Sequence, residues 1–341
     1  MDGVGPFGRK NMPQINAHLD AIAAILRQAL PQPKGCTLNW RPMPYETFKL
    51  TTLHNSYYSD WFVQPYFCDK AAHKLVVDET PLSPLFTVNG IDERIFKRVM
   101  ELRSYTPRDK QLPVLINGRP LLELPPQATQ QLPAGRLYRV NKGCQRFGNQ
   151  NTTVDVCGVN LVVIATPGKE LFMPVTRGQY LDFLVTMTQD DFNHFVQQPY
   201  EQVNHDYYPT RGPWEEAVRK DKAERDAKVN RLIAYRDNMS GSERQLPAFV
   251  PDDSRTGGFR FNYEGVLNRL DEKQPVFSAP GTDWQLVTLN ENYFDATLPP
   301  YVSQLISFSW QFDANVAFMK DFNHVMLEKL DYKAIAALLC K

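Results

Sequence analysis

Residues 304–312 read Gln-Leu-Ile-Ser-Phe-Ser-Trp-Gln-Phe, and this stretch decides the fold class. Large apolar side chains alternate here with polar ones: Ile306, Phe308, Trp310 and Phe312 against Ser307, Ser309 and Gln311. Successive side chains of a β-strand point to opposite faces of the sheet, so the alternation predicts one buried and one wetter face. This is typical of an antiparallel sheet, and we expect residues 284–289 to form the other strand of a pair.

Outward from this stretch, helical and strand-like patterns occupy separate parts of the chain. Apolar residues recur at helical spacing from Pro13 to Leu30, and short aromatic and β-branched runs follow from Cys36 to about Ala165. The Asn117-Gly118 pair between two such runs predicts a β-hairpin. Further helices are expected over residues 92–103, 176–187 with Thr176 as N-cap, 190–203, 214–236, and in two segments from 313 and from 331.

The length and the order of these patterns predict an α+β fold with antiparallel sheets, flanking helices and two subdomains. A chain of 341 residues exceeds the ~250–300 residues at which single cores stop growing. We expect a leading helix and a β-rich domain in residues 1–165. Residues 166–341 are expected to hold the helical segment, the final strand pair and the C-terminal helices. The loop-rich residues 238–281 are expected to be extended and to link subdomains.

Composition excludes several classes of function. Lysine plus arginine and aspartate plus glutamate both number 38, so no net field attracts nucleic acid. No apolar run approaches the ~20 residues of a membrane-spanning helix, and the first residues lack the apolar stretch of a signal peptide. The letters of a G-x-G-x-x-G motif occur at residues 3–8, but no strand precedes them. We therefore expect no cofactor, no metal and no transmembrane segment.

The five cysteines show no C-x-x-C spacing, which disfavours zinc ribbons and thioredoxin-type redox sites. Cys144 and Cys157 flank a polar turn rich in Gly and Asn, and a disulfide between them is one interpretation. Free buried thiols are the other.

The densest group of polar and aromatic residues runs from Asp190 to Trp214. A carboxylate precedes a histidine by four residues twice, at Asp190 and His194 and at Glu201 and His205. A carboxylate one helical turn before a histidine can orient the imidazole as a base or metal ligand. A hydrolase-like site is therefore one hypothesis, with these candidate residues: Arg177, His194, His205, Asp206 and Arg211. The alternative is that they form ordinary pairs on a helix surface.

Aromatic residues give a second set of candidates, for binding a protein or a carbohydrate: Tyr207, Tyr208, Trp214, Tyr58 and Trp61. Aromatic side chains also fill cores, so a structural role is the alternative reading. Residues 215–228 hold ten charged residues, and four pairs stand four apart: Glu215/Arg219, Glu216/Lys220, Asp221/Arg225 and Glu224/Lys228. This spacing predicts a solvated helix, or a helix that binds a partner.

Three segments resemble an uncharacterised group of bacterial exported proteins. They are Pro-Val-Thr-Arg-Gly-Gln-Tyr-Leu at 174–181, Leu-Pro-Ala-Phe-Val at 246–250, and Asn-Glu-Asn-Tyr-Phe-Asp at 290–295 followed by Leu298-Pro299. The resemblance implies an extracytoplasmic location, periplasmic or secreted, and implies no activity. The function remains unknown from the sequence. We favour an exported binding or interaction protein without catalytic activity over the hydrolase, and a purely structural subunit is a third hypothesis.

Overall fold

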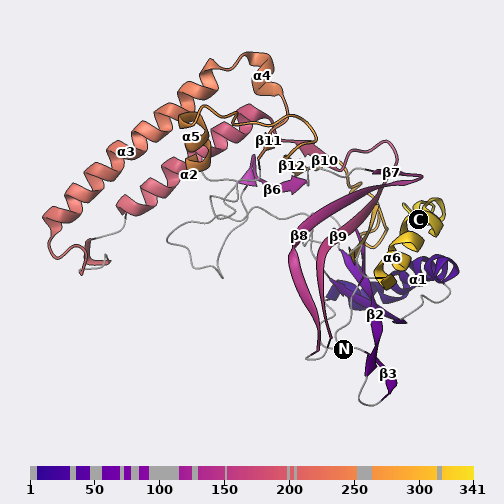
Figure 1. The fold of residues 1–341 in the computed structure, drawn as a ribbon. Coiled ribbons are helices and arrows are strands. Elements are labelled where there is room, and N and C mark those ends of the chain that lie inside the picture. Colours follow the sequence, from indigo (N-terminus) through magenta and orange to yellow (C-terminus); the bar gives the residue numbers. More distant parts are fainter. Residues whose placement is uncertain are drawn as a thin grey trace. The chain divides into compact units, whose positions relative to one another are not determined.

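The computed structural model describes residues 6–30, 36–46, 56–69, 73–77, 84–91, 115–124, 130–149, 152–197, 200–202, 206–251, 263–312 and 317–341. Helices combine with antiparallel sheets, which confirms the α+β fold (Figure 1). Two compact units are present, each built from separated segments. Unit 1 comprises Met1–Lys97, Gln127–Leu171 and Leu289–Lys341, and unit 2 comprises Arg98–Pro126 and Phe172–Thr288. Each of the two expected domains, 1–165 and 166–341, thus contributes to both units. The helix expected at 92–103 lies outside the described residues.

Unit 1 contains an eight-stranded sheet whose central strand comes from the end of the chain. The strands are β1 (Cys36–Glu46), β2 (Tyr57–Asp69), β3 (Lys74–Val77), β4 (Leu85–Val88), β7 (Gln130–Leu132), β8 (Gly135–Asn149), β9 (Thr152–Ala165) and β13 (Leu305–Phe312). Their order is β1-β2-β4-β13-β9-β8-β7, with β3 paired to β2. Ile306 of β13 pairs with Val88 on one side and Ile164 on the other. The expected pairing of 284–289 with 304–312 is wrong, because β4 and β9 occupy both edges of β13.

The polar side of β13 is also buried. Ser307 and Ser309 are each 1% exposed, so the expected wetter face is wrong. A serine hydroxyl can be buried when it finds a hydrogen-bond partner. The Ser307 hydroxyl donates to the Gly90 carbonyl at 3.0 Å.

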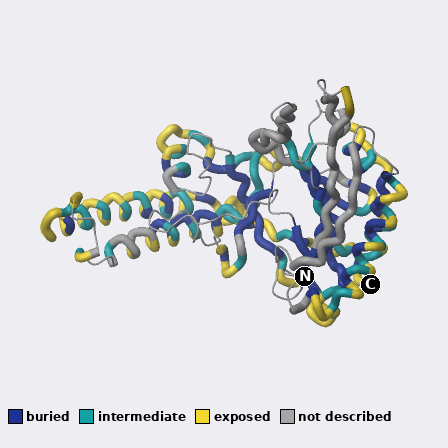
Figure 2. The backbone as a smooth tube through the Cα atoms, turned by 90° about the horizontal axis from the view of Figure 1, so that it is seen from below, coloured by how far each residue is buried: buried dark blue, intermediate teal, exposed yellow. Residues whose placement is uncertain are grey.

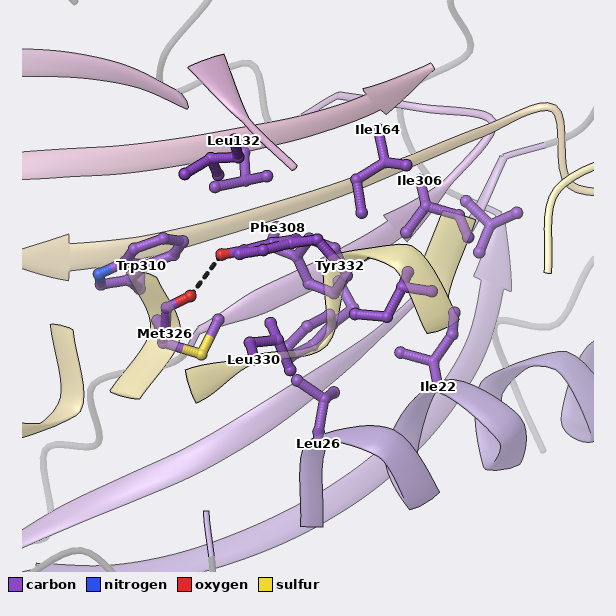
Figure 3. Packing of buried hydrophobic residues seen from close by; sticks show 14 of the residues in the cluster. Ile22, Leu26, Leu132, Ile164, Ile306, Phe308, Trp310, Met326, Leu330 and Tyr332 are labelled. Carbon is purple, nitrogen blue, oxygen red and sulfur yellow. Dashed lines mark hydrogen bonds between the residues drawn. The ribbon is translucent and has the colours of Figure 1, made fainter. Parts of the chain in front are cut away.

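The core of unit 1 lies between this sheet and helices from both ends of the chain. These helices are α1 (Pro6–Ala29), α6 (Ala317–His324) and α7 (Tyr332–Ala336), with a π-helical turn at Val325–Lys329. Figure 3 shows Ile22 and Leu26 of α1 near Leu330 and Tyr332. The expected docking of the C-terminal helices on the sheet is confirmed by this shared cluster. Helix α1 begins at Pro6, so Pro13 lies inside the helix and not in its first turn as expected.

A buried asparagine joins the end of β4 to the start of β13. Asn89 is fully buried and has a left-handed backbone with φ of 53°. Its side-chain amide donates to the Val302 carbonyl at 2.8 Å. Its side-chain oxygen accepts from the backbone N–H groups of Gln304 at 2.8 Å and Leu305 at 3.3 Å. One side chain therefore satisfies three backbone groups of the segment that leads into β13.

The segment 290–304 is held by a second set of polar contacts. The buried Tyr293 hydroxyl donates to the Gln304 carbonyl at 2.6 Å and accepts from the Thr166 backbone N–H at 2.9 Å. The Gln304 side-chain oxygen accepts from the Asp295 backbone N–H at 2.7 Å. The Asn-x-Asn-Tyr-Phe-Asp segment is thus a loop of unit 1 that hydrogen bonds of Tyr293 and Gln304 hold in place.

Unit 2 contains a five-stranded sheet of short strands: β5 (Leu115–Ile116), β6 (Arg119–Leu124), β10 (Phe172–Pro174), β11 (Phe249–Val250) and β12 (Trp284–Leu289). The order is β10-β12-β6-β5, and β11 also pairs with β12. The hairpin expected at Asn117-Gly118 is confirmed, with φ of 52° and 76° at these residues between β5 and β6.

The helices of this unit are α2 (Arg177–Gln197), a 3₁₀ turn (Tyr200–Gln202), α3 (Arg211–Asn238), α4 (Gly241–Gln245) and α5 (Tyr263–Asp271). Residues of α2, α3 and α5 belong to its buried core. Residues 176–197 form one continuous helix with its cap, not the expected end at 187 and restart at 190. The extended linker expected at 238–281 is also wrong for its described part. Ala248, Val266 and Phe277 from this segment are buried in the core of unit 2.

The expected N-cap at Thr176 is confirmed. The Thr176 hydroxyl accepts from the backbone N–H of Gln179 at 3.2 Å, and the Gln179 side chain accepts from the Thr176 backbone N–H at 2.9 Å. These reciprocal bonds form a capping box, which satisfies two backbone N–H groups at the start of α2. The Pro-Val-Thr-Arg segment therefore fixes where α2 begins.

Candidate functional site at the tip of the helical hairpin

Helices α2 and α3 form an antiparallel hairpin within unit 2, where they lie side by side (Figure 1). Near its base, Arg236 of α3 contacts Asp182 of α2 at 2.5 Å. Farther along, Arg225 of α3 reaches the backbone of Thr188. We call residues 188–197 and 215–228 the distal half of the hairpin, and residues 200–202 and 206–214 the tip.

The two halves of the hairpin differ in burial. At the base, Leu181 and Leu184 of α2 belong to the same buried cluster as Val229 and Leu232 of α3. Between 215 and 228, α3 has no buried residue. Figure 2 shows exposed residues along much of this hairpin. The distal half of α3 therefore adds little to the core of unit 2.

The charges on α3 form pairs within the helix. Asp221 and Arg225 lie 3.3 Å apart, which confirms one of the expected pairs. Arg219 pairs with Glu216, and not with Glu215 as expected. A pair that was not expected joins Lys222 to Asp226 at 3.3 Å. Most of these groups are exposed, and such pairs contribute only about 0.3–0.5 kcal/mol each.

Arg225 forms a polar link between the two helices in the distal half. Its side chain is 14% exposed, and its guanidinium donates to the Thr188 carbonyl at 2.9 Å while it pairs with Asp221. The Thr188 hydroxyl in turn donates to the Leu184 carbonyl at 2.7 Å. A hydrogen bond from a charged donor is about twice as strong as a neutral one. Arg225 thus holds α3 against the middle of α2.

The tip is ordered by contacts among its own side chains. The Tyr200 hydroxyl donates to the Tyr208 carbonyl at 2.8 Å, which closes the segment between the 3₁₀ turn and α3. The Arg211 guanidinium lies 5.8 Å from the centre of the Tyr200 ring and 3.0 Å from the Glu201 carboxylate. The rings of Tyr208 and Trp214 meet edge to face at 5.1 Å, with Trp214 buried.

Tyr207 projects from this ordered tip. Its side chain is 77% exposed, whereas the other exposed large apolar residues whose burial is described reach only 43–48%: Leu115, Met173 and Leu246. A tyrosine on a rigid support offers a large apolar ring and a hydroxyl at small entropic cost. Tyr207 therefore presents an exposed aromatic ring and hydroxyl beside residues that contact one another.

The residues of the hydrolase hypothesis do not all meet. Arg177 lies in the first turn of α2 and His194 in its last, about 25 Å apart along the axis at about 1.5 Å per residue. The Arg177 guanidinium lies 5.0 Å from the centre of the Phe277 ring, in the core region of unit 2. Asp206 and Arg211 lie at the tip, where Arg211 pairs with Glu201. His205 and the side chain of His194 lie outside the described part of the chain.

The remaining sequence candidates lie in the sheet of unit 1. Tyr58 pairs with Thr87 and Trp61 with Trp40 across the strands, but the side chains of Tyr58 and Trp61 are outside the description. The same holds for the side chains of Cys144 in β8 and Cys157 in β9. Over the described ranges, no group of three His, Cys, Asp or Glu residues is placed to hold a metal ion.

Sequence reasoning missed two residues of the hairpin. Arg225 appeared only as half of an ion pair, because its bond to a backbone carbonyl of another helix has no signal in the sequence. Tyr200 was not singled out, although it closes the tip. Nothing in the sequence around Tyr200 indicates that its hydroxyl bonds to the Tyr208 carbonyl, eight residues farther along the chain.

Comparisons with known proteins give no relative from which a role can be transferred: no protein-family model, curated protein or solved structure matches this chain. In the described residues, no helix combines the length and the apolar character needed to cross a membrane.

Proposed function

We propose that this protein is a binding protein that contacts a partner protein through the tip of the α2–α3 hairpin. The observation that carries the proposal is the exposed Tyr207 on a tip that is ordered by its own contacts. Trp214 and Tyr208 pack against each other, and Arg211 is held by Glu201. A preorganised tip loses less conformational entropy on binding than a flexible loop.

The charge of the flanking helix supports a protein as the partner. Five acidic and five basic residues stand between 215 and 228, so this flank has no net charge. A nucleic acid or an anionic membrane is bound by an excess of basic residues, which is not present there. A specific interface needs about 800 Å² on each side, so the flank of α3 has to contribute beside the tip. A partner surface with both signs of charge and a pocket for a tyrosine ring fits these features.

The hydrolase hypothesis gains no support from the described geometry, because Arg177 and the tip residues lie at opposite ends of α2. An extracytoplasmic location accompanies the binding proposal. It is supported by the resemblance of three segments to bacterial exported proteins, and immunoblotting of fractions of the native host tests it.

Photo-crosslinking in the native host tests the binding proposal. A photoreactive phenylalanine analogue replaces Tyr207 in one variant and the exposed Lys273, in a turn after α5, in a control. We expect a discrete adduct with one protein from position 207 and none from position 273. Equal adducts from both positions, or none from position 207, would overturn the proposal.

The captured protein then allows a quantitative test. A central contact residue contributes at least about 2 kcal/mol, so Tyr207→Ala should weaken binding roughly 30-fold. Tyr207→Phe keeps the ring and should lose much less. Because Tyr207 is exposed, neither variant should change the thermal midpoint of unfolding. Unchanged affinity in Tyr207→Ala would show that the tip is not the contact surface.

A further inference from the structure

The backbone register of β8 and β9 places two cysteines at the same register shift. The strands pair antiparallel, with Gln145 opposite Val156 and Asn141 opposite Gly158. Between these pairs the register shifts, so that residues 142–144 of β8 lie opposite a single residue of β9. That residue is Cys157. Of the three residues opposite it, Cys144 adjoins the Gln145 pair, so extending the Gln145–Val156 register by one step leads from Cys144 to Cys157.

This juxtaposition fits the dimensions of a disulfide. Directly opposed residues of an antiparallel pair have Cα atoms about 4.5–5.5 Å apart and share one face of the sheet. Disulfides span Cα separations of about 4.4–6.8 Å. The register gives no other cysteine such a partner, since Cys36 pairs with Pro65 and Cys68 with Leu75.

The outer part of the β8–β9 hairpin also needs support. The pairs of β13 with β9 cover only Gly158–Ala165, and the pairs of β7 with β8 cover only Gly135–Leu137. Among the described strands, residues 142–149 of β8 and 152–157 of β9 therefore form a ribbon of two strands with no third neighbour. An isolated two-stranded ribbon is marginally stable in water. A covalent link at the register shift would fix the pairing at the point where it is weakest.

We propose that Cys144 and Cys157 form a disulfide that staples the outer β8–β9 ribbon. A small-molecule or protein disulfide serves as the oxidant. One cysteine thiolate attacks it and forms a mixed disulfide, with release of one thiol. The second cysteine thiolate then displaces the other thiol, so two protein thiols lose two electrons and two protons and the oxidant disulfide gains them.

Mass spectrometry of the purified full chain tests this after incubation with oxidised glutathione and an excess of reduced glutathione, which returns unpaired cysteines to free thiols. The chain is denatured and alkylated with iodoacetamide, before or after reduction, and then digested. We expect one linked peptide pair that joins Cys144 to Cys157 and disappears on reduction. The exposed Cys340 is free and should be alkylated in both samples, which serves as the internal control.

Two variants and a dynamic measurement complete the test. Cys144→Ser should leave Cys157 open to alkylation without reduction, and Cys157→Ser should do the same for Cys144. Reduction of the wild-type chain should speed amide hydrogen exchange in residues 142–157 and not in residues 158–165. Alkylation of both cysteines in the unreduced chain, or a link from either to another cysteine, would overturn the proposal.

Discussion

Replacing Asn89 should destabilise unit 1 far more than replacing another asparagine in the same backbone conformation. Asn89 has φ of 53° and is fully buried, while Asn117 has φ of 52° and is exposed in the β5–β6 turn. Glycine adopts this conformation freely, so Asn→Gly at either position leaves the backbone unstrained. The two substitutions differ in the hydrogen bonds that are lost.

The structure gives the size of the effect. Asn89→Gly removes the acceptor of the Gln304 and Leu305 backbone N–H groups and the donor to the Val302 carbonyl. A buried group left without its partner costs about 1–3 kcal/mol, and the bond to Leu305 is long at 3.3 Å, so we expect a loss of about 3 kcal/mol. Asn117→Gly should cost about 0.5–1 kcal/mol, from the entropy of the unfolded chain alone. Asn89→Ala should lose about 1 kcal/mol more than Asn89→Gly, because alanine is strained in the left-handed backbone conformation of this position.

Urea unfolding followed by pulsed hydrogen exchange measures these losses, because peptides from β13 report on unit 1 and peptides from α2 on unit 2. We expect the β13 transition of Asn89→Gly to move to lower urea while the α2 transition stays in place. Equal losses in Asn89→Gly and Asn117→Gly would refute the reasoning. Asn89 would then matter only for its backbone conformation, and the three side-chain bonds would contribute nothing net.

Three other residues give predictions of their own. Thr176→Ala removes the helix cap and should lower the free energy of unfolding of unit 2 by about 1 kcal/mol, with recovery in Thr176→Ser; identical urea midpoints for all three chains would contradict this. Arg225→Ala leaves the Thr188 carbonyl without its charged donor and should cost about 1–2 kcal/mol in the distal half of the hairpin, read as faster hydrogen exchange there and not at the base. Burial lowers the pKa of His18 against a smaller opposing hydrogen bond to the Lys341 backbone. The unfolded chain therefore binds the proton more readily, and the stability of unit 1 should fall as the pH drops below about 6.5, a dependence that His18→Asn should flatten in thermal unfolding from pH 5 to 8.

Local signals in the sequence predicted local structure well. The Asn117-Gly118 turn, the Thr176 cap and the strand at 305–312 all rest on rules that involve a few neighbouring residues. The partners of that strand could not be predicted in this way. Its alternation indicates an antiparallel sheet, but pairing with β4 and β9 depends on contacts far along the chain. Burial of Ser307 likewise depends on the Gly90 carbonyl, which the sequence does not place beside it.

The candidate site shows the same limit. The concentration of aromatic and charged residues from 190 to 214 was visible in the sequence, and the tip lies within it. The sequence could not show that Tyr208 and Trp214 pack together while Tyr207 is exposed. Tyr207 and Tyr208 are neighbours of the same residue type, and only the fold decides which of them faces solvent. Arg177 was grouped with residues of the tip, and the continuous helix α2 separates them.

The position of β13 between β4 and β9 has a consequence for synthesis on the ribosome. β4 and β9 leave the ribosome first. The segment 172–288, which makes up most of unit 2, leaves next, and β13 leaves only after that segment. During that interval two neighbours of the missing strand present unpaired backbone groups. Unpaired edges of this kind are sites of aggregation. Unit 2 can therefore be complete while β4 and β9 still lack their common neighbour β13. In cells with too little chaperone, chains whose synthesis ends before residue 305 should accumulate as aggregates in which unit 2 is folded.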